Sequence, residues 1–345
     1  MKILVIAPSW VGDTMISQGM YRTLKVKYPT ARIDVMASQW CRSLLKRMPE
    51  VNKTLSMPLD HGVLAISERR RLGISLRASQ YERAYVLPNS FKSVLVPFFA
   101  NIPQRIGWRG EMRYGLLNDI RVLDKLAFPM MIQRYITLTY DKKDIRSAAD
   151  LLQPLLWPQL QVRNEEILEI TRLFNITNKR PIIGLCPGAE SGLAKRWPHY
   201  YYSILAQQLI NNGYQVALFG SVKDYFIGEE IRLVINKNNH YNYLNLAGQT
   251  SLEQVVVLIA ACNAIVSNDS GLMHIAAALN KPLIAIYGPT SPNFTPPLSK
   301  KAKVIRLTTN YYKRGKDSII QGYDQSLINI TPEQVMIALN QQLSS

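Results

Sequence analysis

One segment limits the possible folds of this chain more than any other: a strand, a polar turn and a helix that lead directly into a second strand. The runs 264–266 and 283–287 are apolar enough for buried strands, and residues 272–279 place apolar side chains on one helix face. Strands joined through a helix build a parallel, doubly wound sheet. The turn 268–271 (Asn-Asp-Ser-Gly) lies where the helix begins. In such sheets ligands bind at this edge, and a helix N-terminus suits a phosphate.

The same alternation of strands and helices continues along the chain. We expect buried strands at 3–7, 32–36, 84–87, 105–107, 182–186, 215–219, 243–246, 264–267, 283–287 and 304–307. A length of 345 residues exceeds one typical domain. We therefore expect two α/β doubly wound domains, residues 1–165 and 166–330, followed by a helix in 331–345 that Thr331 caps.

Composition and charge exclude several classes of protein. No apolar run is long enough to span a bilayer, and the three cysteines are far apart, which favours reduced thiols in a cytoplasmic protein. The net charge is +17, and residues 1–150 hold 24 Lys and Arg against 12 Asp and Glu. Such a basic half suits a polyanion, whether nucleic acid, an anionic membrane or a phosphorylated substrate, although no nucleic-acid motif is present.

Three strand-to-helix turns carry candidate functional residues. Asp13 follows the first strand, where it is either a functional carboxylate or a helix N-cap, the commoner role for Asp on local pattern alone. Gly188, Ser191 and Lys195 follow the strand at 182–186 and could bind a pyrophosphate, unless this is an exposed loop with incidental cations. Asp224 follows the strand at 215–219, where a capped polar turn is the stronger alternative to a ribose contact.

The turn that opens the helix near residue 271 has the same ambiguity. Asp269 and Ser270 are good helix caps, and His274, one turn further on, is a residue type that is more often structural than a ligand when alone in an apolar helix. There is no D-x-D motif and no His or Cys spacing typical of a metal site. GxGxxG and P-loop motifs are also missing, which leaves the common dinucleotide and P-loop interpretations with little support.

Together these motifs resemble those of the bacterial ADP-heptose:lipopolysaccharide heptosyltransferases, glycosyltransferase family 9. The resemblance covers nearly the whole chain and is strongest at 7–13 (APSWVGD), 86–93 (VLPNSFKS), 107–115 (GWRGEMRYG), 194–198 (AKRWP) and 268–274 (NDSGLMH). It implies a GT-B fold, with two Rossmann-like domains facing across a cleft and the last helix packing back on the N-terminal domain. It also implies an inverting, metal-independent transfer without a cofactor.

The resemblance assigns roles to matching residues. Asp13 would be the catalytic base. The donor, ADP-L-glycero-D-manno-heptose, would be bound by Gly188, Ser191, Lys195, Asp224, Asp269, Ser270, Gly271 and His274. Glu190 departs from the pattern of a related heptosyltransferase that has a hydroxyl residue there, so it is expected to hold a sugar hydroxyl or a cation rather than a phosphate.

The implied acceptor is the first heptose of the lipopolysaccharide inner core, in heptosyl-Kdo2-lipid A. The cations assigned to this acceptor are Arg69, Arg70, Arg71, Lys92, Arg109 and Arg113, and no nucleic acid is expected as a partner. A cytoplasmic enzyme in transient, peripheral contact with the anionic face of the inner membrane is implied. Three alternatives stay open: a family member acting at another core position, as heptosyltransferases I and III do, a sugar-nucleotide epimerase, and a non-catalytic polyanion-binding protein.

Overall fold

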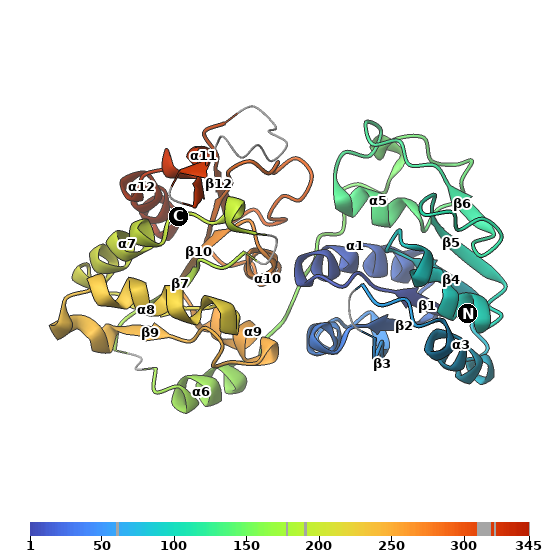
Figure 1. Ribbon diagram of the computed structural model, residues 1–345, viewed down its shortest axis with the longest axis horizontal. Coiled ribbons are helices and arrows are strands. Elements are labelled where there is room, and N and C mark those ends of the chain that lie inside the picture. Colours follow the sequence, from blue (N-terminus) through green and yellow to red (C-terminus); the bar gives the residue numbers. More distant parts are fainter. Residues whose placement is uncertain (60–61, 177–178, 190–191, 309–318, 321, 345) are drawn as a thin grey trace. The chain divides into compact units, whose positions relative to one another are not determined.

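The computed structural model describes residues 1–59, 62–176, 179–189, 192–308, 319–320 and 322–344. The chain divides into two compact units, Met1–Pro158 and Gln159–Ser345. Each unit contains a six-stranded parallel sheet with helices on both faces (Figure 1). The expected class of fold, α/β with two doubly wound sheets, is therefore confirmed.

The sheet of the first unit has the strand order β3-β2-β1-β4-β5-β6. Its strands are β1 (Lys2–Ile6), β2 (Arg32–Ala37), β3 (Val51–Ser56), β4 (Arg83–Val86), β5 (Gln104–Trp108) and β6 (Asp119–Arg121). Every neighbouring pair is parallel, with Ile3 opposite both Ile33 and Arg83 at the centre. All six strands therefore end at one edge, and the loops that follow them lie side by side.

Helices cover both faces of this sheet. On one face lie α1 (Val11–Lys27) and α5 (Met131–Thr137), and on the other lie α3 (Ile66–Ser75) and α4 (Leu95–Phe99), while α2 (Arg42–Lys46) packs on β3. Side chains of α1 at the predicted spacing, Ile16, Met20 and Leu24, are almost completely buried. The apolar face expected for this helix is thus confirmed.

The sheet of the second unit has the order β12-β11-β10-β7-β8-β9. Its strands are β7 (Ile182–Cys186), β8 (Gln215–Leu218), β9 (Tyr243–Asn245), β10 (Ala264–Asn268), β11 (Leu283–Ile286) and β12 (Ala302–Ile305). β10 pairs with β7 and β11, both parallel. The chain reverses direction across the sheet between β7 and β10, which makes their carboxyl ends the switch point where ligands bind in this class of fold.

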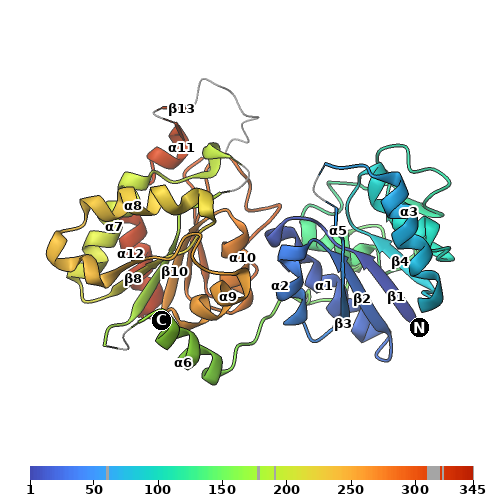
Figure 2. The same ribbon diagram turned by 60° about the horizontal axis from the view of Figure 1, so that its bottom comes forward.

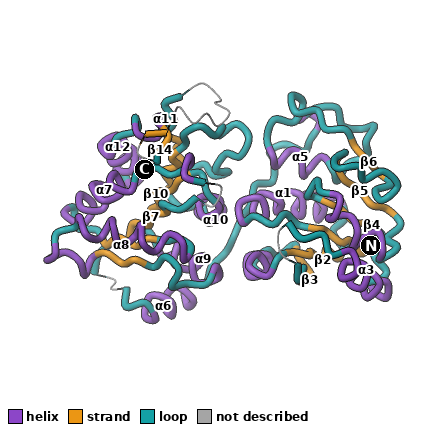
Figure 3. Tube along the Cα trace, viewed as in Figure 1, coloured by secondary structure: helices purple, strands orange, loops and turns teal. Residues whose placement is uncertain are grey.

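Figure 2 shows the two helical layers of the second unit. One consists of α7 (His199–Asn211), α8 (Tyr225–Val234) and α12 (Pro332–Leu343), and the other of α6 (Asn164–Leu173), α9 (Leu252–Ala261) and α10 (Gly271–Ala278). A short hairpin of β13 (Ile319–Ile320) and β14 (Tyr323–Asp324) precedes α11 (Gln325–Ile328). In Figure 3 the alternation of strand and helix can be followed through both units.

All ten strands expected from the sequence are present. In the two six-stranded sheets, β3 and β6 were not predicted, and neither were the hairpin strands β13 and β14. β3 and β6 are the edge strands of the first sheet. β3 exposes Asn52 and Lys53, and β6 has only three residues, Asp119–Arg121. Edge strands need less apolar surface and often carry charge, so they lack the pattern that reveals a buried strand.

The structure differs from the expected organisation at the domain boundary. A domain boundary between 165 and 166 would fall inside α6, which packs on α9 in the second unit, so the division after Pro158 comes earlier. The helix in 331–345 begins as expected, with the Thr331 hydroxyl accepting from the N–H of Gln334. It continues as α12, which buries Val335 and Leu339 in the core of the second unit. The packing of this helix on the N-terminal domain stays a prediction.

Candidate functional site

The carboxyl edge of the second sheet brings together the predicted donor-binding residues. Lys195 lies in a 3₁₀ turn, Leu193–Lys195, between β7 and α7, and Asp269 directly follows β10. The Lys195 Nζ donates to Asp269 Oδ2 at 2.7 Å, and the Asp269 side chain is only 6% exposed. From the sequence, Lys195 and Asp269 were predicted to lie in the same site, but they were not predicted to form an ion pair. A lysine ammonium has three donors, so it can bind another anion beside Asp269.

A buried asparagine at the end of β10 connects this edge to its neighbours. The Asn268 Oδ1 accepts from the Trp197 backbone N–H at 3.2 Å and from the Tyr202 hydroxyl at 3.0 Å. Its Nδ2 donates to the Pro187 carbonyl at 2.6 Å. The sequence pattern assigned no role to Asn268, although a polar side chain ending a buried strand must find partners. Pro187 and Trp197 lie on the loop that carries Lys195, and Tyr202 lies in α7, the helix that follows this loop.

Asp224 forms a second charged pair at the same edge, after β8. Its Oδ1 pairs with the Arg196 guanidinium at 3.2 Å, and its Oδ2 accepts from both the N–H and the hydroxyl of Ser221 at 2.8 Å. A Cβ added at Gly188 would lie 2.6 Å from Asp224 Oδ2, and one at Gly220 2.7 Å from Asp224 Cβ. These contacts fit the capped-turn alternative for Asp224 and show why Gly188 has no side chain. Arg196, to which the sequence pattern assigned no role, is the partner.

The first turn of α10 opens toward this edge. Ser270 occupies the N-cap position, but its side chain makes no capping hydrogen bond to the helix; its hydroxyl lies 3.3 Å from that of Ser267. The expectation that Ser270 caps through its side chain is therefore wrong. Backbone N–H groups at Gly271 and the next residues keep their capacity to donate to an anion.

His274 lies one turn into α10 and is 7% exposed. Burial lowers its pKa to about 4, the positive charge of Lys195 acts in the same direction, and the negative charge of Asp269 opposes both. The imidazole is therefore neutral near pH 7. Ser191, the remaining donor-binding candidate, and Glu190 lie outside the described residues.

Asp13 lies in the first turn of α1, at the carboxyl edge of the first sheet. Trp10 holds the N-cap position, so the alternative that Asp13 is the cap is wrong. The negative charge of Asp13 contributes to the raised pKa values of the Cys41 thiol and the Tyr135 hydroxyl, for which burial is the main cause. Thr14, the next residue, donates its hydroxyl to the Pro8 carbonyl at 3.2 Å and so ties the turn to the end of β1.

Two of the six cations assigned to the acceptor serve the first unit itself. Arg69 is 4% exposed and donates to the carbonyls of Val63 and Leu64. Arg113 is 1% exposed and donates to the Pro88 and Trp108 carbonyls. Both assignments are corrected for this reason: a guanidinium that is itself buried and donates to backbone carbonyls of its own unit cannot bind an acceptor. Arg70, Arg71 and Arg109 are exposed and Lys92 is half-buried, so these four stay accessible.

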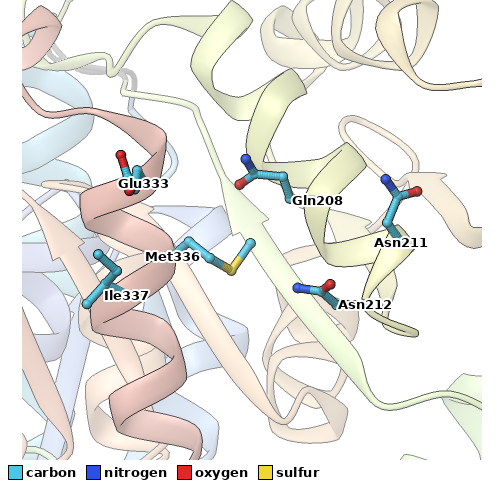
Figure 4. Close-up of a pocket in the computed structure, with 6 residues that line it drawn as sticks. All are labelled: Gln208, Asn211, Asn212, Glu333, Met336 and Ile337. Carbon is cyan, nitrogen blue, oxygen red and sulfur yellow. The ribbon is translucent and has the colours of Figure 1, made fainter.

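A separate, shallow pocket of about 260 Å³ lies between α7 and α12 (Figure 4). It is lined by Gln208, Asn211, Asn212, Glu333, Met336 and Ile337. The first three residues are at the carboxyl end of α7, whereas Lys195 precedes its amino end. This pocket is therefore distinct from the charged edge.

The described residues contain neither a candidate metal cluster nor a candidate membrane span. Among them, no three His, Cys, Asp or Glu side chains are grouped so that they could hold a metal ion. None of the helices in the described part of the chain has both the length and the apolar character needed to cross a membrane.

Comparison with known proteins points to one family. The model of glycosyltransferase family 9 (heptosyltransferase) matches residues 69–323. Lipopolysaccharide heptosyltransferase 2 of Salmonella typhimurium is 64% identical over 100% of this chain and 99% of its own length, and that of Escherichia coli is 64% identical over 99% and 98%. The solved structure of E. coli ADP-heptose lps heptosyltransferase II matches with a TM-score of 0.93, at 62% identity, over 99% of this chain and 98% of that one.

The low pKa of His274 predicts a pH-dependent stability. In the unfolded chain this pKa returns to about 6.5. Between pH 6.5 and 4 the unfolded state therefore binds a proton that the folded state does not, so stability falls as the pH falls through this window. The loss of stability reaches about 3 kcal/mol.

We expect His274→Gln to remove this loss. Urea unfolding of the wild type and the variant at about pH 7 and about pH 4.5 measures it. An equal loss in both would contradict the assignment.

Proposed function

The chain belongs to glycosyltransferase family 9, the heptosyltransferases, and we propose that it is an inverting, metal-independent member that transfers heptose from ADP-heptose to the first heptose of heptosyl-Kdo2-lipid A. The chain is a glycosyltransferase of the GT-B fold, and its activity is ADP-heptose transfer to the lipopolysaccharide inner core. The observation that carries this conclusion is the 64% identity to heptosyltransferases 2 over the whole chain.

The second unit supplies the groups that a nucleotide diphosphate needs. The Lys195 ammonium, which donates to Asp269, has three N–H donors in all, and the N–H groups that begin α10 at Gly271 lie at the same edge. Because Gly188 has no side chain, the backbone there can come close to the diphosphate. As the bond between the anomeric carbon and the phosphate oxygen breaks, ADP leaves with the electron pair. Fixed positive groups of this kind stabilise that charge, a task that a metal ion performs elsewhere.

In this proposal Asp13 is the general base. It accepts the proton of the acceptor hydroxyl while the new carbon–oxygen bond forms on the face opposite to the leaving ADP. A single displacement of this type inverts the anomeric centre and needs one carboxylate. Asp13 lies in the first turn of α1, at the carboxyl edge of the sheet, where ligands bind in such folds.

The acceptor carries phosphates and carboxylates, so the basic first unit suits it. Arg70, Arg71, Lys92 and Arg109 are the accessible cations that we assign to this role. The same surface would hold the enzyme transiently at the anionic cytoplasmic face of the inner membrane, since each basic residue near such a surface adds about 1 kcal/mol. Cytoplasmic localisation is part of this proposal.

Three alternatives are weaker. Transfer at another core position, as by heptosyltransferases I and III, is disfavoured by the high identity to heptosyltransferases 2. A sugar-nucleotide epimerase would release a free product and need no lipid acceptor. A non-catalytic polyanion-binding protein does not fit the match to glycosyltransferase family 9 over residues 69–323.

The choice of acceptor tests the proposed function directly. We expect heptose transfer from ADP-heptose to heptosyl-Kdo2-lipid A and none to Kdo2-lipid A, measured as a mass increase of the lipid. Transfer to the unheptosylated lipid would instead assign the enzyme to the first core position. Release of free sugar without lipid modification would support the epimerase.

Replacement of Asp13 tests the catalytic base. We expect Asp13→Asn to lower kcat by about 10² to 10⁴, because a positioned base contributes that much, while ADP binding measured by calorimetry stays unchanged. The control is Glu165→Gln, an exposed carboxylate on α6. Near-normal turnover of the Asp13 variant would make this residue structural.

Replacement of Lys195 tests the donor site. We expect Lys195→Ala to weaken ADP binding or slow leaving-group departure by about tenfold or more, since a hydrogen bond to a charged group is worth about 1.5–3 kcal/mol. Lys223→Ala, an exposed lysine in the turn after β8, serves as the control. Donor kinetics equal to those of the control would remove Lys195 from the site.

A further inference from the structure

Exposed aromatic side chains gather at one edge of the first sheet. Trp10 follows β1, Trp40 follows β2, Phe91 follows β4 and Tyr114 follows β5, with exposed fractions of 48%, 47%, 36% and 65%. We call these four residues the aromatic edge. In the described part of this unit, the remaining large aromatic side chain with comparable exposure is Phe98, on α4. Exposed aromatic side chains are therefore concentrated where the strands end.

The strand order places the loops that carry these four residues next to one another. β2, β1, β4 and β5 are consecutive neighbours in the sheet. Neighbouring strands lie about 4.8 Å apart, so their four ends span about 14 Å. A row of this length can contact more than one ring of a saccharide.

The aromatic edge is held in place by hydrogen bonds beneath it. The indole N–H of Trp40 donates to the Ser9 carbonyl at 3.0 Å, directly before Trp10. The backbone N–H of Phe91 donates to the Glu111 carboxylate at 2.7 Å. These bonds fix the loop after β2 to the loop after β1, and the loop after β4 to the loop after β5.

Arg113 strengthens the second of these links. Its guanidinium donates to the Pro88 carbonyl at 2.7 Å and to Asn89 Oδ1 at 3.2 Å, on the loop after β4. The loop that carries Arg113 is strained, because Glu111 and Met112 have φ values of 34° and 50° without being glycines. Strained backbone persists only where its surroundings hold it, and it clusters at functional sites.

The proposed base lies within this surface. Asp13 is three residues after Trp10, on the turn that Trp40 contacts through Ser9. A hydroxyl that gives its proton to Asp13 must approach within about 3 Å of the carboxylate. The sugar ring that bears this hydroxyl then lies against the side chains that flank the turn.

We propose that the aromatic edge is a carbohydrate-binding subsite whose rings stack on the sugar rings of the acceptor; the inference rests on the proposed function. The apolar C–H face of a sugar packs on an aromatic face, while its hydroxyl and acidic groups stay available to Asp13 and to cations such as Arg109. Few rigid aromatic groups combined with a few polar ones are typical of specific ligand sites.

The test uses a soluble acceptor, the deacylated heptosyl-Kdo saccharide of the lipid. We expect Trp10→Ala, Trp40→Ala and Tyr114→Ala each to raise the KM for this saccharide by about fivefold or more, because a stacked aromatic contact is worth about 1 kcal/mol. The Kd of the saccharide, measured by calorimetry without donor, should rise by the same factor. The KM for the donor should stay unchanged. Phe98→Ala is the matched control and should equal wild type. Trp40→Phe retains an aromatic ring, although it loses the bond to Ser9. Because the ring makes the proposed stacking contact, we expect this variant to keep most of the saccharide affinity.

Two results would overturn the subsite. One is an unchanged Kd for the saccharide in all three alanine variants. The other is a loss seen only with the acylated acceptor in vesicles, which would make the aromatic edge a bilayer contact. Failure of the proposed function would look different. The wild-type protein would bind the saccharide, and the three alanine variants would bind it more weakly, but no heptose would be transferred to it.

Discussion

The charged edge of the second unit depends on the requirement that a buried amide satisfy its hydrogen bonds. Asn268 ends β10 without exposure to solvent and uses both ends of its side chain, toward the loop after β7 and toward the start of α7. An unpaired buried polar group costs more than a hydrogen bond gains, so these loops have little freedom to separate. The position of Lys195 beside Asp269 results from this, because Lys195 lies two residues before Trp197 on the same loop.

Among the described residues of this edge, two cations are each paired with a carboxylate. Lys195 is paired with Asp269 and Arg196 with Asp224, while His274 is neutral. The attraction for an anion then comes from the Lys195 ammonium, which has three N–H donors, and from the N–H groups of α10. A site built in this way avoids leaving an uncompensated cation half-buried.

Much of the fold could be predicted because buried strands have a recognisable apolar pattern. β7 has the predicted bounds, and most other inner strands are within one or two residues, since both faces of such strands must be apolar. The site was less predictable. Strand ends located Asp13, Lys195 and Asp269 correctly in the topology. The sequence does not reveal, however, whether an arginine faces solvent or is buried against backbone carbonyls, as Arg69 and Arg113 are. Pairings across distant loops, such as that of Arg196 with Asp224, depend on packing that no local pattern contains.

Gly188 and Gly220 approach the carboxylate of Asp224 from two different loops, each too closely for a Cβ. The three positions are therefore sterically coupled. A single replacement at either glycine collides with the Asp224 side chain, and shortening Asp224 would remove the partner of Arg196 and of the Ser221 hydroxyl. Variation among donor loops should thus occur by joint exchange of all three positions, and a graft of one loop from a relative will succeed only if the other two positions accompany it.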